Sequence, residues 1–390
     1  MFSRRTAWVT EPDPLAARGD DCLDLTISNP TAVGFTYPDE FYRRLTDERS
    51  ARYTPDPFGH ADARAAVATY YAARAPTITV DPATIGLTAS TSEAYSHLLA
   101  LLCDPGDVVL VPQPGYPLLR VLAELAHATL VPYPLLYDGT WSIDLDGLAD
   151  VLARTPRVRA VVVVAPNNPT GNYLRPHEQD ALDVLLAPRD IALLVDEVFY
   201  DYPLTDAPRP TPVDHVSACL TFVLSGLSKI AALPQLKLAW WHARGPQGLV
   251  RTALARLELI ADTFLGAATP VQLALPHIFA AMPAMQAQIS RRTLANLTHL
   301  RSACRGSAVS VLDVDAGWLA LLRLPELHDL GDAAWSHRSL ERCGVLVQPG
   351  HLYELPGVHL AVSLLTPEPV LAAGLDRLLD HLAEVLTCGP

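Results

Sequence analysis

Lysine is almost absent from this chain, which has two lysines against 27 arginines in its 390 residues. These two, Lys229 and Lys237, lie close together. Arginine cannot replace lysine where a neutral primary amine must attack a carbonyl, because a guanidinium group does not deprotonate in proteins. A coding bias towards arginine would also remove lysines and leave two by chance. Position argues against chance for Lys229, because it follows an apolar, β-prone run (residues 220–224) and a Ser-Gly turn.

Charge and long apolar runs are scarce as well. Charged residues make up 18% of the chain and hydrophobic residues 50%, which is typical of globular proteins and not of disordered ones. The net charge of −13 disfavours nucleic acid or an anionic membrane surface as a partner. No run approaches the roughly 18–20 apolar residues of a spanning helix, because acidic residues and prolines interrupt the widest apolar region, residues 257–285. We therefore expect neither partner.

Paired cysteines are missing too. The six cysteines are scattered, without a CxxC pair or a spacing typical of metal ligands, so we expect free thiols and no metal site. Arg4 and Arg5 near the N-terminus have no apolar segment behind them, so we do not expect a signal peptide. Both observations favour a cytoplasmic location.

Three apolar runs, residues 160–164, 191–195 and 220–224, are typical of parallel strands covered on both faces. Ligands of such sheets bind outside the carboxyl ends of the strands. Unusual polar residues follow the runs at these ends: Asn168 after the first, Asp196 and Tyr200 after the second, Ser228 and Lys229 after the third. We expect these side chains to converge on one site, with Lys229 at an exposed tip.

Further candidates lie earlier in the chain. Ser90, Thr91 and Ser92 stand where a helix ending at Cys103 begins, and hydroxyls at a helix N-terminus suit either a phosphate or a simple N-cap. Tyr116 lies in a proline-rich loop, residues 112–117. A turn-rich loop, residues 53–59, precedes a helix predicted for residues 61–74.

The C-terminal part has another character. We predict one long helix over residues 285–305, then short strands near residues 310–314, 318–324, 345–347 and 359–364, and a closing amphipathic helix over residues 368–386. The fold class is therefore α/β, a large domain with a mostly parallel, doubly covered sheet plus a smaller α+β domain. We expect an N-terminal arm (residues 1–40) joining the small domain, a large domain (41–284) and a small C-terminal domain (285–390).

Three motifs carry a resemblance to a known family: Asn167-Asn-Pro-Thr-Gly171, Asp196-Glu-Val-Phe-Tyr200 and Ser225-Gly-Leu-Ser-Lys229. The motifs occur in the same order as in that family. From about residue 25 to its end, the chain resembles the class I/II aminotransferases, which are fold-type I pyridoxal-phosphate (PLP) enzymes. The resemblance implies pyridoxal 5′-phosphate as cofactor, a small-molecule amino donor, a carbonyl acceptor, and a homodimer with shared active sites.

Residue roles follow from the resemblance. It implies that Lys229 forms the Schiff base (internal aldimine) with PLP and later moves a proton, that Asp196 pairs with the pyridine nitrogen, and that Asn168 and Tyr200 donate to the ring's phenolate oxygen. Tyr116 resembles the aromatic residue that stacks on the ring. The implied phosphate ligands are Ser90, Thr91, Ser92, Ser228 and Lys237, with Tyr53 reaching the phosphate of the neighbouring subunit.

Two positions depart from the family pattern. Lys237 stands where relatives carry an arginine, so a point charge replaces a bidentate fork at the phosphate. Ala361 stands at the arginine that clamps the substrate's α-carboxylate. Either another group binds the carboxylate, with Arg323, His351 and His359 as candidates, or the substrate amine lacks one there.

The activity implied by the resemblance is a PLP-dependent transaminase, moving an amino group between an amine or amino-acid donor and a keto or aldehyde acceptor. Two alternatives stay open. Another reaction on the same cofactor, β-elimination, decarboxylation or racemisation, depends on which Cα bond the substrate-binding groups hold perpendicular to the ring. The other alternative is a non-catalytic PLP-binding relative, because the site that binds the substrate's α-carboxylate in this family is altered here.

Overall fold

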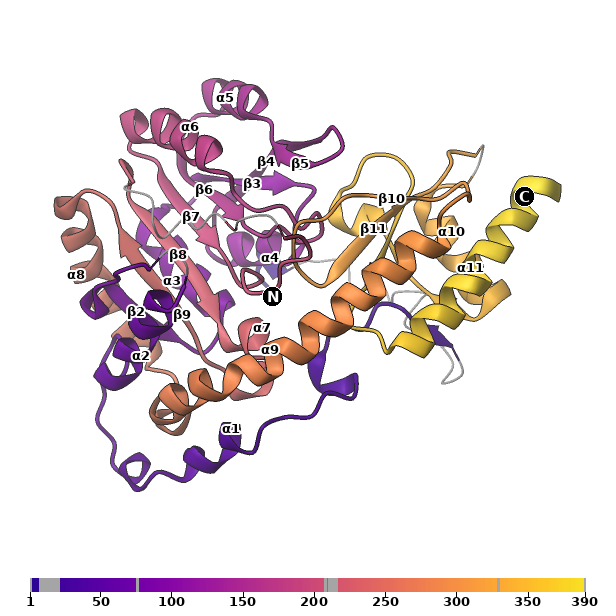
Figure 1. Ribbon diagram of the computed structural model, residues 1–390. Coiled ribbons are helices and arrows are strands. Elements are labelled where there is room, and N and C mark those ends of the chain that lie inside the picture. The colour runs from indigo at the N-terminus through magenta and orange to yellow at the C-terminus, as the bar shows by residue number, and fades with distance from the viewer. Residues whose placement is uncertain are drawn as a thin grey trace.

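The computed structural model describes residues 2–6, 22–74, 77–206, 209, 217–327 and 330–388 (Figure 1). Within these residues an eight-stranded sheet forms the centre of the larger part. Its strands, in spatial order, are β2 (Ile85–Thr88), β9 (Ala239–Arg244), β8 (Thr221–Gly226), β7 (Ala192–Asp196), β6 (Val158–Val164), β3 (Val108–Gln113), β4 (Thr129–Tyr137) and β5 (Trp141–Ile143). The run from β8 to β4 is parallel, and the pairs β2–β9, β9–β8 and β4–β5 are antiparallel. The predicted mostly parallel sheet is confirmed.

Helices cover both faces of this sheet, which explains why its strands are apolar without alternation. In β6, Val161 and Val163 belong to one hydrophobic core, whereas Val162 and Val164 belong to another on the opposite face. The first core is covered by α2 (Ala61–Ala72), α5 (Leu145–Arg154), α6 (Pro176–Leu186) and α9 (Thr269–Ala303). The second is covered by α3 (Thr91–Leu102), α4 (Leu118–Leu125) and α8 (Gln247–Phe264).

A smaller α+β part has its own core. Its antiparallel sheet has the order β10 (Ser310–Val311), β11 (Leu319–Arg323), β14 (His359–Ser363) and β13 (Gln348–Pro349). The helices α10 (Asp332–Cys343) and α11 (Glu368–Cys388) pack beside it. The N-terminal arm adds β1 (Leu23–Asp24), which pairs in parallel with β12 (Val345–Leu346). Leu25 then enters the same core, fully buried.

The long helix α9 differs from the sequence prediction, which began it at residue 285. It begins at Thr269 and continues through Pro276 and Pro283 to Ala303, running from the large sheet to the small part (Figure 1). Each proline removes a helical hydrogen bond, yet packing maintains the helix, since Ile278 and Met282 are buried in the main core. Residue 285 therefore lies inside a helix, and the predicted domain limits stay a prediction.

The described α-helices also include two short ones, α1 (Glu40–Arg43) and α7 (Leu227–Ile230). None of the helices in the described ranges is by itself long and apolar enough to cross a bilayer. The pair α8 and α9, bent by 119°, meets that length and composition only when counted together.

Candidate active site

A cavity of about 370 Å³ opens at the carboxyl ends of β6, β7 and β8. Asn168, Asp196, Ser228 and Lys229 all line it, so the structure brings together four of the five polar residues that follow these strands. The fifth, Tyr200, does not line it. The parallel register of β7 and β8 places the strand ends side by side, with Asp196 opposite Leu224. The cavity therefore collects its chemistry from three neighbouring strands.

Lys229 lies on the single-turn helix α7, directly after β8. Gly226 allows the close approach of β8 and β9 just before this helix, because a Cβ there would lie 2.7 Å from the Ala239 Cβ on β9. The Lys229 Nζ atom is 5.3 Å from the ring centroid of Trp318 and 5.7 Å from that of Phe199. The predicted exposed tip is therefore wrong, because Lys229 is only partly exposed and these two aromatic rings lie beside its amine. Burial lowers the pKa of Lys229, and the negative charge of Asp196 opposes that shift.

Asp196 is buried at the end of β7 and held from two sides. The Tyr95 hydroxyl donates to its Oδ2 at 3.2 Å, and the Val198 amide donates to its Oδ1 at 3.2 Å. Burial raises the pKa of Asp196 to about 6, although both hydrogen bonds and the charge of Lys229 lower it. Sequence reasoning missed Tyr95. Its spacing of four residues from Thr91, which puts both on one face of α3, was the available signal.

The N-terminus of α3 forms another wall of the cavity, lined by Ser90, Thr91 and Ser92. The Ser90 Oγ accepts from the Glu93 amide at 3.1 Å, so Ser90 is an N-cap as well as a cavity residue. The hydroxyls of Thr91 and Ser92 form no hydrogen bond within the described chain. Lys237, with a left-handed φ of 52°, adds a cation to the same cavity. This wall therefore offers donors and one positive charge to an anion.

Tyr116 lines the cavity from the loop before α4 and is 45% exposed. Asn168 lines it as well, and its Oδ1 atom is buried without a hydrogen-bond partner in the described protein. A buried polar atom facing a cavity without a partner indicates a site for a polar ligand.

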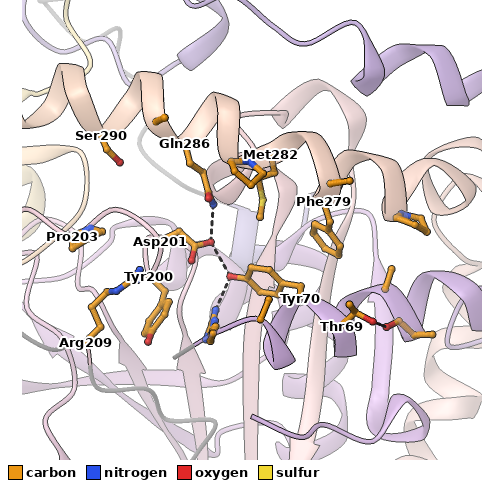
Figure 2. Close-up of a pocket in the computed structure, with 18 of the residues that line it drawn as sticks. Thr69, Tyr70, Tyr200, Asp201, Pro203, Arg209, Phe279, Met282, Gln286 and Ser290 are labelled. Atoms are coloured by element: carbon orange, nitrogen blue, oxygen red, sulfur yellow. Dashed lines mark hydrogen bonds between the residues drawn. The ribbon is translucent and has the colours of Figure 1, made fainter. Parts of the chain in front are cut away.

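Tyr200 lies in a different cavity of about 860 Å³, between α2 and α9 (Figure 2). Its ring is buried, with the Arg74 guanidinium 3.9 Å above its centroid. The preceding residue, Phe199, lines the Lys229 cavity instead. The chain turns directly after β7, so consecutive side chains leave in different directions, and only one reaches the site. The expectation that Tyr200 donates to the cofactor ring is therefore corrected. The neighbouring side chain that lines the cavity, Phe199, has no hydroxyl to donate.

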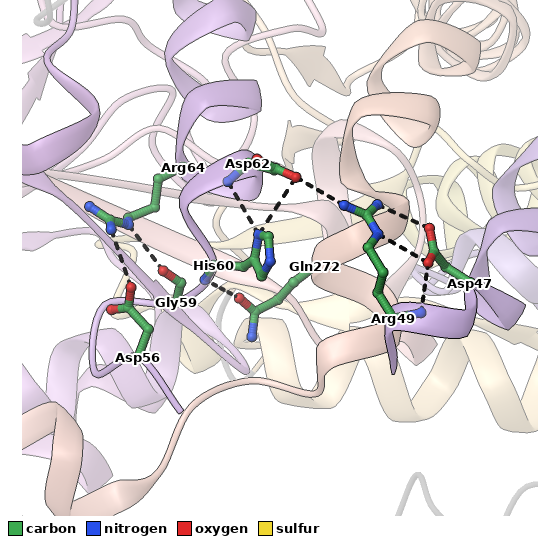
Figure 3. A network of polar contacts seen from close by, with 8 residues as sticks. All are labelled: Asp47, Arg49, Asp56, Gly59, His60, Asp62, Arg64 and Gln272. Carbon is green, nitrogen blue, oxygen red and sulfur yellow. Dashed lines mark hydrogen bonds and ion pairs between the residues drawn. The ribbon is translucent and has the colours of Figure 1, made fainter. Parts of the chain in front are cut away.

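Tyr53 also lies outside the Lys229 cavity of its own chain. It is 76% exposed, on the loop before α2. Polar contacts hold this loop (Figure 3): the His60 amide donates to Gln272 Oε1 at 2.6 Å, and Arg64 donates to the Gly59 carbonyl and contacts Asp56 at 3.3 Å. The expected contact of Tyr53 with a neighbouring subunit stays a prediction.

The three candidates for binding a substrate carboxylate do not line the cavity. His359 is buried opposite Arg323 in the small sheet, and His351 contacts Asp332 at 3.1 Å. Ala361, in the arginine position, is fully buried in β14. Other residues that sequence reasoning did not single out do line the cavity: Ser28, Leu118, Leu119, Trp318, Leu319, Gln348 and Tyr353.

Comparison with known proteins agrees with this geometry. The family model described as aminotransferase class I and II matches residues 21–378. This chain belongs to the class I and II aminotransferases. The glutamate-pyruvate aminotransferase AlaA of Escherichia coli (strain K12) is 30% identical over 273 residues, 68% of this chain and 65% of the relative. The alanine aminotransferase of Mycobacterium tuberculosis (strain ATCC 25618 / H37Rv) is 33% identical over 269 residues, 67% of this chain and 61% of the relative.

This chain thus spans less than two thirds of the length of either relative. Among solved structures, a single mutant of the aspartate aminotransferase of Thermus thermophilus has a TM-score of 0.84 at 21% identity, covering 97% of this chain and 99% of the other. That likeness shows the shared α/β fold.

Class I and II aminotransferases use pyridoxal 5′-phosphate, and the residues of the cavity fit this group. The Thr91 and Ser92 hydroxyls and Lys237 suit its phosphate, and Lys229 suits its aldehyde. Asp196 suits its pyridine nitrogen, and the partnerless amide of Asn168 lies in the same cavity. No cluster of three or more possible metal ligands occurs among the described residues.

Proposed function

We propose that this chain is a PLP-dependent transaminase that moves an amino group from an amine or amino-acid donor to a keto or aldehyde acceptor. The observation that carries the proposal is the single cavity shared by Lys229 and Asp196, at the carboxyl ends of two neighbouring strands. When bound, the cofactor supplies a ring that accepts the electrons left on the donor's Cα as its proton departs.

Two side chains of the chain carry the remaining chemistry. The amine of Lys229 would bind the cofactor's aldehyde carbon, C4′. Once displaced by the donor, it would take the proton from the donor's Cα and deliver it to C4′. Its lowered pKa favours the neutral amine that this transfer requires. Asp196 holds the proton on the pyridine nitrogen by charge, and its pKa of about 6 leaves most of it ionised at neutral pH. The rings of Phe199 and Trp318 lie beside this amine and reduce its contact with water.

Covalent labelling and product analysis test this proposal. Borohydride should lock PLP onto the peptide that contains Lys229, and Lys229→Ala should abolish the linkage, whereas Lys237→Ala should retain it. In a separate sample that has not been reduced, amino donors should convert the bound cofactor stoichiometrically to its amine form. Release of ammonia or CO₂, or inversion at Cα, would instead assign another reaction on this cofactor. Absence of the linkage in the wild-type protein would refute the assignment.

We further propose a cytoplasmic homodimer with shared active sites. The exposed position of Tyr53, on a loop held by ion pairs and hydrogen bonds outside its own cavity, supports a contact with a second copy. Mixing two inactive variants, Lys229→Ala and Tyr53→Ala, under conditions that exchange subunits should restore activity, because one site of each hybrid is intact. Recovery must fail if each site is complete within one chain.

A further inference from the structure

The pairing of β13 with β14 defines what replaces the family's carboxylate-binding arginine. Gln348 lies directly opposite Ala361 in this antiparallel pair. Directly opposite side chains project from the same face of a sheet, with Cβ atoms about 4.5–5.5 Å apart. Ala361 is fully buried and carries only a methyl group, whereas Gln348 lines the Lys229 cavity. The polar group on this wall is therefore a neutral carboxamide.

Tyr353 fixes the orientation of that carboxamide. Its hydroxyl donates to the Gln348 Oε1 at 2.6 Å. Burial raises the pKa of Tyr353 to about 12, so the phenol stays protonated and keeps donating at neutral pH. The Oε1 atom thus accepts this hydrogen bond, whereas the Nε2 group donates none to any residue that the structure describes. Gln348 therefore presents N–H donors to an occupant of the cavity.

The charged residues that line the cavity are those that suit the cofactor, namely Lys229, Lys237 and Asp196. Of the described residues that line it, the cations are Lys229 and Lys237, which suit the aldehyde and the phosphate. Other residues that line the same cavity are neutral, among them Ser28, Tyr116, Leu118, Leu119, Trp318 and Leu319. A carboxylate placed there loses its hydration and gains only neutral donors, which compensate an ion poorly. A neutral oxygen acceptor loses far less hydration and accepts the same hydrogen bonds.

We propose that the amino donor carries a neutral oxygen acceptor, a carboxamide or hydroxyl, where common donors carry an α-carboxylate, and that Gln348 binds this oxygen. The proposal rests on the transaminase function above and narrows its donor to primary amines that carry such a neutral group and no α-carboxylate. Tyr353 acts as a positioning residue, because its hydroxyl contacts Gln348 and sets which end of the amide faces the donor.

Three donors with the same Cα and methyl group test the proposal on the PLP-loaded enzyme: L-alaninamide, L-alanine and 2-aminopropane. Single-turnover loss of the visible absorbance of the bound cofactor gives a second-order rate constant for each. We expect L-alaninamide to exceed L-alanine at least tenfold, equivalent to about 1.4 kcal/mol. An L-alanine rate equal to or above that of L-alaninamide overturns the proposal.

Variants of Gln348 separate recognition from the intrinsic basicity of the donors, because each donor is compared with itself. Gln348→Leu should slow L-alaninamide about tenfold and leave 2-aminopropane within about twofold, the size expected for one buried hydrogen bond. Gln348→Arg should move the preference towards L-alanine. Gln235→Leu, at an exposed glutamine that contacts Tyr42 outside the cavity, serves as the matched control and should change nothing. Equal slowing of all donors by Gln348→Leu would contradict the proposal.

Binding without turnover distinguishes failure of this inference from failure of the proposed function. Calorimetry with propanamide and propanoate, which lack the amine, should give the tighter binding for propanamide, and Gln348→Leu should remove that difference. If this holds while no donor transfers its amine, the transaminase proposal fails and the recognition of a neutral oxygen stands. Tighter binding of propanoate, or no binding of either compound, overturns the recognition itself.

Discussion

The hydroxyl of Tyr95 donates a hydrogen bond to Asp196 Oδ2 at 3.2 Å and so joins the middle of α3 to the end of β7. The same helix begins with the hydroxyls at the phosphate end of the cavity. The second carboxylate oxygen of Asp196 accepts from the Val198 amide. One helix therefore positions the groups that suit both ends of the cofactor, and Tyr95 acts on the reaction through Asp196 as a positioning residue.

Tyr95→Phe should weaken cofactor binding most on the acid side. In the wild type, the hydrogen bond from Tyr95 lowers the pKa of Asp196. Removing that bond raises the pKa, so the carboxylate protonates at a higher pH. Protonated Asp196 no longer stabilises a pyridinium, and we expect about tenfold weaker PLP binding near pH 6, the lower range for a hydrogen bond to a charged group. Absorbance titrations with PLP at a series of pH values measure the shift.

Tyr133→Phe is the matched control for that variant. The Tyr133 hydroxyl is equally buried and donates to the Val162 carbonyl, away from the cavity lining. Its loss should lower the free energy of unfolding by about 1 kcal/mol and leave the pH dependence of PLP binding unchanged. A shift of equal size in both variants would show that Tyr95 has only a general structural role.

Arg74→Met should destabilise the protein by about 3–5 kcal/mol, because it leaves the carboxylate of Glu197 buried without its partner. The two side chains are 5% and 0% exposed and lie 2.9 Å apart, and the Tyr71 hydroxyl donates to the same carboxylate. Urea unfolding measures the loss. Adding Glu197→Gln to Arg74→Met should recover part of it, since the uncompensated charge is removed.

An exposed ion pair provides the comparison. Arg120 and Glu354 lie 2.7 Å apart but are 66% and 46% exposed, so Arg120→Ala should cost less than about 1 kcal/mol. A similar cost for both arginine variants would contradict the assignment of the large effect to burial.

Lys237→Ala should weaken PLP binding about fivefold, the effect of one exposed charge pair of ~1 kcal/mol, without removing the covalent linkage to Lys229. Lys237 is exposed, so salt screens its attraction to a phosphate. The wild-type affinity should therefore fall more steeply with added salt than that of the variant. Parallel slopes would show that Lys237 does not contact the phosphate.

Phe199→Tyr and Tyr200→Phe form a reciprocal pair. The first adds a hydroxyl to a ring that lines the cavity 5.7 Å from the Lys229 amine, so the visible spectrum of bound PLP should change its pH dependence. The second removes a hydroxyl from the other cavity, so the spectrum should stay as in the wild type. A spectral change in Tyr200→Phe alone would restore the role first assigned to Tyr200.

Which polar residues converge could be predicted, because the carboxyl ends of parallel strands meet at one edge whatever the loops do. Asp196 ends β7, whereas Asn168, Ser228 and Lys229 lie within four residues of the ends of β6 and β8, and all four line one cavity. The same reasoning fails for Tyr200, which lies as far from β7 as Asn168 does from β6, because Phe199 lines the cavity whereas Tyr200 lines another one. The start of α9 was also missed, because packing maintains a helix across prolines that locally favour a break.

The fold class and the family could be predicted from the chain alone, and so could the proposal of Lys229 as the reactive amine, since apolar runs and motifs are local properties of the chain. The surroundings of that amine depend on the tertiary structure. Tyr95, Trp318 and Gln348 come from elements far apart in sequence, and no local pattern specifies which side chains face the same space. The register between β13 and β14 placed Gln348 opposite Ala361, because strand pairing joins positions that the sequence keeps apart.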